Sequence, residues 1–263
     1  MMRYLKRRRH FIEVRREDKT ACKVETCPFG EAISFFNERI AKLAEFEIDI
    51  ARLLGMRNLS AFVGELYGAS VIKAAGGLYR KNPHQDGYPD LLVMDGKGRQ
   101  EWERLAGQLR DKKPFSPFRP GGIEIKATVG SVPSPQWFQK NGLQKPDIGD
   151  SRIEFLRGYD WKAHHRGTNN LLGIMWDFVK GVPCITAVFY SHELTQADWG
   201  GIIQPREGGG NTTSVSIMTR AGVRRMYEGW LYVLDSPRCR EFLDQYNNGT
   251  QFQADLASCA IEL

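Results

Sequence analysis

The spacing of hydrophobic residues along the chain first predicts two consecutive helices. From Glu31 to Leu54, apolar side chains recur every three or four positions, which is typical of a helix, and Gly55 stands where such a helix would end. Ser60 is placed to cap a second helix, from Ala61 to about Ala75, before a pair of glycines.

Farther along the chain, a spacing of two residues, typical of strands, alternates with short helical segments. Strands are expected at 91–95, 122–128, 171–179, 183–191, 214–218 and 230–234, and helices at 99–110, 219–228 and 236–246. Helices followed by a cluster of strands and then mixed elements predict an α/β (α+β) fold with a mixed central sheet flanked by helices. Since no repeat or linker is evident, residues 1–263 are predicted to form a single domain.

The net charge of +6 is concentrated at the N-terminus. Residues 1–19 contain eight lysines and arginines against three acidic residues, which predicts a basic N-terminal arm of about twenty residues on a nearly neutral body. Such an arm could neutralise phosphates, or it could be a solvated tail. Charge alone therefore does not decide the function.

Composition places the chain among intracellular globular proteins. Hydrophobic residues make up 41% and charged residues 26%, and no apolar run is long enough to span a bilayer. Without a secretory signal, we expect a cytoplasmic protein whose five cysteines are reduced. Cys22 and Cys27 could supply half a zinc site, but no second Cys/His pair at ligand spacing accompanies them.

Several common catalytic motifs are missing or incomplete. The chain has no GxxxxGK[ST] phosphate loop and no GxGxxG after a predicted strand. His192-Glu193 does not continue as a zinc protease motif, because Gln196 stands where the second histidine is needed. His164, His165, Asn169 and Asn170 invite comparison with His-Asn-His nucleases, but no further histidine is suitably placed.

The predicted strand at 122–128 carries the first part of a candidate active site. A period of two puts Ile123 and Ile125 on one face and Glu124 and Lys126 on the other. A carboxylate can bind Mg²⁺, which prefers oxygen ligands, and a neighbouring ammonium can stabilise charge on a phosphoryl group. An amphipathic edge strand with solvated charges would show the same pattern.

The second part of the candidate site lies upstream, where Pro89 and Asp90 precede an apolar strand. Proline restricts the backbone there, so the aspartate stands at a defined strand start. If this strand pairs with 122–128, Asp90 and Glu124 can converge on one cation. A turn aspartate before a strand is the alternative, and Asp86 and Asp95 are the substitutes for Asp90.

In combination, the helix, the Pro-Asp strand and the apolar-Glu-apolar-Lys strand resemble the PD-(D/E)xK nuclease superfamily, most closely type II restriction endonucleases. The resemblance covers roughly residues 60–190 and implies metal binding by Asp90 and Glu124 and catalysis by Lys126. It implies Mg²⁺ as cofactor, double-stranded DNA as substrate and a homodimer as the assembly. The interval between Asp90 and Glu124 is longer than is usual in that family, so the helix at 99–110 is expected to be an insertion.

Other residues are weaker candidates. Glu65 lies in a stripe of small and apolar residues on the second predicted helix, so it is expected to bind the metal or to form a buried ion pair. Two polar segments offer partners for phosphates and base edges, or are ordinary solvated loops. The candidate DNA-binding residues in them are Lys112, Lys113, Arg119, Arg157, Lys162 and Arg166.

Two functions from other classes fit the same sequence. One is a repair or recombination nuclease with the same metal centre that recognises DNA structure rather than sequence. The other is a DNA-binding or assembly module that has the fold but no catalysis. The sequence does not distinguish these from a restriction enzyme.

Overall fold

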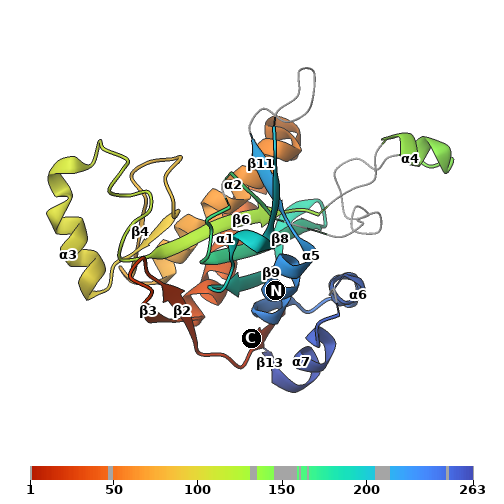
Figure 1. Ribbon diagram of the computed structural model, residues 1–263. Coiled ribbons are helices and arrows are strands. Elements are labelled where there is room, and N and C mark those ends of the chain that lie inside the picture. Colours follow the sequence, from red (N-terminus) through yellow and green to blue (C-terminus); the bar gives the residue numbers. More distant parts are fainter. Residues whose placement is uncertain are drawn as a thin grey trace.

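A large mixed sheet flanked by helices forms the centre of the protein, as the sequence predicted (Figure 1). The computed structural model describes residues 2–46, 50–130, 135–144, 159, 161–164, 166–204, 214–246 and 249–262. In the described strands, the sheet order is β13-β1-β12-β9-β8-β6-β5-β4. Neighbouring strands are antiparallel except β6 and β8, which run parallel.

The sheet combines strands from both ends of the chain. Its members are β1 (Tyr4–Arg7), β4 (Tyr79–Lys81), β5 (Leu91–Val93), β6 (Gly122–Thr128), β8 (Leu171–Val179), β9 (Val182–Ser191), β12 (Trp230–Leu234) and β13 (Ala260–Glu262). The predicted strands 122–128, 171–179 and 230–234 have the predicted bounds, and the predicted hairpin of β8 and β9 is confirmed. Nearly every residue of β8, β9 and β12 is buried, because helices or loops cover both faces of the sheet there.

The N-terminal segment does not form the basic arm that we expected. Strand β1 pairs with β12 and β13 within the large sheet, and β2 (Phe11–Arg15) pairs with β3 (Ala21–Glu25) in a hairpin. Tyr4 is buried, and its hydroxyl donates a hydrogen bond to the carbonyl oxygen of Ile185 at 2.7 Å. The prediction was wrong because Tyr4, Ile12, Val14 and Val24 of these short strands are buried in the core, whereas most of the basic residues around them stay at least partly exposed.

The helix predicted from Glu31 to Leu54 is divided between two helices. Helix α1 spans Cys27–Ala44, and helix α2 spans Ile50–Ala74 with a break at Gly55, where φ is 64°. The two helices pack against each other, so apolar residues of both face one core and keep a nearly continuous periodicity along the chain. Ser60 lies within α2 rather than at its start, and its hydroxyl donates to the carbonyl oxygen of Ala127 at 3.3 Å.

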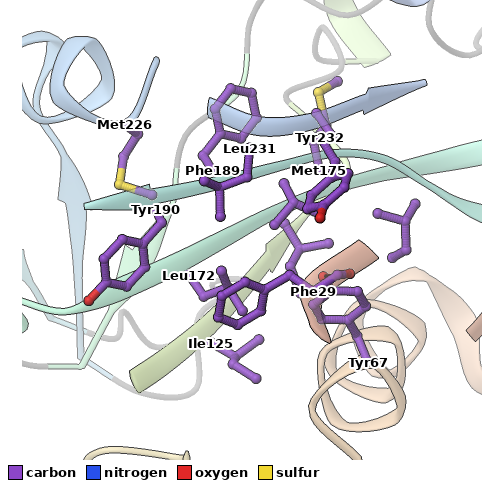
Figure 2. Close-up of a cluster of buried hydrophobic side chains, with 14 of the residues drawn as sticks. Phe29, Tyr67, Ile125, Leu172, Met175, Phe189, Tyr190, Met226, Leu231 and Tyr232 are labelled. Atoms are coloured by element: carbon purple, nitrogen blue, oxygen red, sulfur yellow. Dashed lines mark hydrogen bonds between the residues drawn. The ribbon is translucent and has the colours of Figure 1, made fainter. Parts of the chain in front are cut away.

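Helix α2 packs closely against β6 because glycines face the strand. A Cβ atom on Gly68 would lie 3.0 Å from Ile125 Cδ1, and one on Gly64 would lie 3.7 Å from the Cβ of Ala127. Figure 2 shows Phe29 of α1 and Tyr67 of α2 in the same cluster of buried side chains as Leu172 and Ile125 of the sheet. Gly64 and Gly68 therefore allow α2, with its neighbouring polar residue Glu65, to lie close to β6.

The insertion between β5 and β6 contains helix α3 (Gly96–Arg104) and the short 3-10 helix η1 (Ala106–Gln108), close to the prediction. Asp95 is the N-cap of α3 and accepts a hydrogen bond from the N–H of Gly98 at 3.0 Å. In Figure 1 this insertion projects at one side of the molecule, next to β4. It has its own small hydrophobic cluster, formed by Leu92, Met94, Leu105, Phe115 and Phe118 with Trp102 beside it.

The C-terminal part covers the opposite end of the sheet and adds a second, smaller sheet. Helices α5 (Arg220–Glu228), α6 (Pro237–Gln245) and α7 (Phe252–Cys259) pack near β9, β12 and β1. As predicted, Thr219 caps α5 and accepts from the N–H of Gly222. The smaller sheet has the order β10 (Trp199–Ile203), β11 (Val215–Met218) and β7 (Lys162–Ala163), and helices α4 (Pro135–Lys140) and η3 (Gln196–Asp198) complete the described elements.

Candidate active site

The pairing of β5 with β6 brings Asp90 to Glu124. Leu91 lies opposite Ile123 and Leu92 opposite Gly122, so Asp90, immediately before β5, comes next along β6. The Asp90 carboxylate accepts a hydrogen bond from the backbone N–H of Ile125 at 2.7 Å. This side chain therefore takes the place of the next strand-to-strand hydrogen bond, and the expected adjacency of the two strands is confirmed.

Glu124 and Lys126 form an ion pair that is largely withdrawn from solvent. Their Oε1 and Nζ atoms are 2.5 Å apart, and the side chains are 7% and 23% exposed. The alternative of a solvated amphipathic edge strand is therefore excluded for these two residues. The second carboxylate oxygen, Oε2 of Glu124, is buried without a hydrogen-bond partner among the described residues. A buried anionic oxygen without a partner is costly, so it marks a position suited to a cation.

Burial and neighbouring charges shift the pKa values of Asp90 and Lys126, both upward. Burial, together with the neighbouring charge of Glu124, raises the pKa of Asp90 to about 7. For Lys126, burial by itself lowers the pKa, but the charges of Glu124 and Asp90 outweigh it and leave the pKa above its ordinary value. Lys126 is therefore a firmly protonated cation at neutral pH, suited to stabilising negative charge rather than to accepting a proton.

These three residues line a cavity of about 1340 Å³. Residues of α2 and β6 form part of its wall, and residues 15–17, the loops before β5 and β6, and Asn169 and Asn170 also contribute to it. Five lysines and arginines line it against five acidic residues: Arg15, Arg16, Lys81, Lys112 and Lys126 against Glu17, Glu65, Asp86, Asp90 and Glu124. Since these charges balance, a polyanion would be attracted only after some carboxylates are neutralised by protons or a cation.

Glu65 lies on the wall of this cavity but already has a partner. Its carboxylate is 2.6 Å from Nζ of Lys81, and both side chains are more than half exposed. The expected buried ion pair is therefore an exposed one, because the stripe of small residues around Glu65 opens onto the cavity. The negative charge of Glu65 still contributes to the raised pKa of Asp90.

The two substitutes for Asp90 have other partners. Asp95 caps α3 and forms an ion pair with the buried guanidinium of Arg16, and it does not line the cavity. Asp86 lines the cavity, but it is exposed and its carboxylate lies 2.6 Å from Nζ of Lys112. Asp90 is thus the aspartate that shares its surroundings with Glu124.

The candidate DNA-binding residues are not brought together. Lys112 lines the cavity, while Lys113 is exposed elsewhere on that loop and Arg119 lies 3.7 Å from Glu17. Lys162 is exposed on β7, and Arg166 donates to the carbonyl oxygens of Gln196 and Trp199, which indicates a structural role. Arg157 lies outside the described residues.

Tyr88 contributes to the site although nothing in the sequence singled it out, and Asn169 comes from one of the two polar segments that were expected to offer partners for phosphates and base edges. Both line the cavity, and the Tyr88 hydroxyl donates to Oδ1 of Asn169 at 3.0 Å. Tyr88 also lies close enough to Glu124 and Asp90 for their charges to raise its pKa, although burial is the main cause of that shift. The sequence gives only a weak indication of their role, since each is a polar residue shortly before a buried strand.

The donors present fit a divalent cation of the magnesium type. Among the described residues, no group of three His, Cys, Asp or Glu side chains is arranged as a metal site. Mg²⁺ does not require one, because it is commonly bound through one or two carboxylates, with water and substrate phosphates completing its ligands. Asp90 and Glu124, with the partnerless Oε2, supply such a pair.

Comparison with protein-family models, with characterised proteins and with solved structures finds no match to this chain. Within the described part of the chain, helices are too short or too polar to cross a bilayer.

Proposed function

We propose that this protein is a Mg²⁺-dependent endonuclease that hydrolyses phosphodiester bonds of double-stranded DNA. The observation that carries the proposal is the convergence of Asp90, Glu124 and Lys126 in one cavity, with a buried carboxylate oxygen that has no partner. The resemblance of their sequence pattern to PD-(D/E)xK nucleases supports the same assignment. We place the protein in the cytoplasm, where such an enzyme would meet DNA.

The roles of the residues follow from their charges and surroundings. Asp90 and Glu124 would hold the cation, which when bound supplies Lewis acidity toward a phosphoryl oxygen and a more acidic water. Lys126, with its raised pKa, would donate to the phosphate and stabilise the negative charge that develops during hydrolysis. Glu65 is a possible additional ligand only if its carboxylate leaves Lys81.

A plasmid-cleavage assay with and without Mg²⁺ tests the proposal. We expect Glu124→Gln and Lys126→Gln each to lower the cleavage rate by about 100-fold or more, as for other preorganised charge-stabilising groups. Glutamine is preferred to an apolar residue at both positions, because its amide can still hydrogen-bond the remaining partner. Removing one partner outright would cost about 3–5 kcal/mol of stability.

Matched controls lie on α3, away from the cavity. Glu101→Gln and Lys97→Gln make the same chemical changes at residues that form ion pairs outside the cavity, Glu101 with Arg104 and Lys97 with Asp18. Both variants are expected to cleave at the wild-type rate. Equal rates in the two site variants and the wild type would remove Glu124 and Lys126 from the active site.

The products of the same assay distinguish the competing functions. Discrete fragments from linear duplex DNA support sequence-specific cleavage of the type II restriction kind. Cutting confined to branched, nicked or otherwise distorted DNA supports a repair or recombination nuclease. No cutting with Mg²⁺ or Mn²⁺, despite binding, supports a non-catalytic DNA-binding module.

Cleavage of both strands at a symmetric site calls for two active centres related by a two-fold axis, so we propose a homodimer on DNA. Sedimentation with a short cognate duplex and Ca²⁺, which commonly permits binding without cleavage, measures the stoichiometry. Two chains per duplex are expected. One chain per duplex would contradict the dimer and favour successive nicking.

A further inference from the structure

The pair formed by Asn169 and Tyr88 points to an additional substrate contact, which rests on the proposed nuclease function. Asn169 lies two residues before β8, and Tyr88 lies shortly before β5. Because β8 and β5 are the two neighbours of β6, this pair links the segments on either side of the strand that carries Glu124 and Lys126. Both residues line the cavity.

Hydrogen bonds determine which way the Asn169 amide points. Its Oδ1 accepts from the backbone N–H of Asn170 at 2.8 Å and from the Tyr88 hydroxyl at 3.0 Å. The same hydroxyl accepts from the backbone N–H of Asn169 at 3.3 Å. A backbone N–H can only donate, so the atom facing it must be the amide oxygen rather than the nitrogen.

The amide nitrogen of Asn169 remains available to donate a hydrogen bond to a ligand. Nδ2 of Asn169 makes no hydrogen bond to any residue that the structure describes, whereas both lone pairs of Oδ1 are in use. The side chain therefore offers the cavity a donor in a held orientation and no free acceptor. Asn170, by contrast, is buried and uses both ends of its amide on the backbone of Arg15.

We propose that Nδ2 of Asn169 donates a hydrogen bond to a non-bridging phosphate oxygen of the DNA strand in this cavity, with Tyr88 as the positioning residue. A phosphate oxygen requires only a donor. Reading an adenine edge with asparagine uses the amide nitrogen and oxygen together, and the oxygen of Asn169 is already occupied. The contact is therefore independent of base sequence.

The variant Asn169→Asp isolates the donor. Aspartate keeps an oxygen for the N–H of Asn170 and the hydroxyl of Tyr88, while the other oxygen replaces Nδ2. Affinity is measured by fluorescence anisotropy with several duplexes of different sequence, in Ca²⁺ so that binding is read without cleavage. We expect affinity to fall about ten- to a hundredfold for every duplex, as for a lost hydrogen bond to a charged group.

Two further variants complete the design. Gln85→Glu adds the same charge at a different, exposed position on the cavity wall, and it is expected to weaken binding much less than Asn169→Asp. Tyr88→Phe removes the hydroxyl that holds the amide, so binding should weaken about two- to tenfold on all duplexes. Tyr88→Phe also keeps the test decisive if Asn169→Asp does not fold.

The outcomes separate this contact from the nuclease proposal. Asn169→Asp binding within twofold of the wild type, or no more weakly than Gln85→Glu, would overturn the contact, as would wild-type affinity in Tyr88→Phe. A loss confined to duplexes with one particular base would replace the phosphate with a base edge. Wild-type protein that binds DNA without cutting it in Mg²⁺ contradicts the nuclease and leaves the contact standing, whereas absence of DNA binding contradicts both.

Discussion

Asp90→Asn is expected to make the cation-free protein more stable at pH 8 while removing its response to Mg²⁺. The asparagine oxygen can still accept the hydrogen bond from the N–H of Ile125. The substitution removes the negative charge of the Asp90 carboxylate. Burial and the charge of Glu124 both disfavour that negative charge, which is why the pKa of Asp90 is raised. The site therefore stores an unfavourable interaction that the substitution relieves.

The magnitude follows from the pKa of Asp90, which burial and Glu124 raise from 3.8 to about 7. A shift of three units corresponds to a ceiling of about 4 kcal/mol. Asp90 is only partly buried, so solvent screening reduces the expected gain to about 1–2 kcal/mol.

The upward direction of the Asp90 pKa shift determines the pH range over which stability changes. Because the folded-state pKa lies above the unfolded one, protonated Asp90 favours folding, and this contribution is lost as the pH rises from about 4 to about 7. The stability difference between Asp90→Asn and the wild type should therefore be small near pH 4, grow up to pH 7 and stay constant above it.

Denaturant unfolding at several pH values in EDTA measures this difference, and subtraction of the two proteins cancels most other titrations. A parallel Mg²⁺ titration should stabilise the wild type, by about 2.7 kcal/mol at 100 times the dissociation constant, and leave Asp90→Asn unchanged. A lower stability of Asp90→Asn than of the wild type at pH 8, or a stability difference that does not vary with pH, would contradict this prediction.

Three further substitutions test the framework around the site, each by chemical denaturation. Gly64→Ala should stabilise the protein by about 0.5–1 kcal/mol, because alanine favours the helix and its Cβ would make an ordinary contact with β6; a loss of stability would contradict this packing. Gly122→Ala should destabilise it by about 2 kcal/mol or more, since its Cβ would come 2.2 Å from the carbonyl oxygen of Leu91 and force β5 from β6; unchanged stability would show that the strands can separate freely. Asp95→Ala should cost about 3 kcal/mol or more, through the lost N-cap and the unpaired buried Arg16, without changing Mg²⁺ affinity measured by calorimetry; an altered affinity would reopen Asp95 as a ligand.

Elements with strong local signals were predicted from the sequence alone. Alternation over 122–128 specified β6, the turn at Lys180-Gly181 specified the β8–β9 hairpin, and Thr219 marked the start of α5. In each case the deciding contacts lie within a few residues of one another. The pattern around Asp90, Glu124 and Lys126 belongs to the same class, because strand period alone puts Glu124 and Lys126 on one face.

Long-range packing decided the rest. Hydrophobic periodicity could not show that β1 enters the sheet between β12 and β13, because that position depends on partners more than 200 residues away. It also could not divide α1 from α2, since both helices face one core. The burial of Glu124 depends on layers covering the sheet, and the orientation of Asn169 depends on a hydroxyl from Tyr88, 81 residues away. Local pattern thus determined which residues could do chemistry, whereas tertiary contacts determined their partners, their burial and hence their charge states.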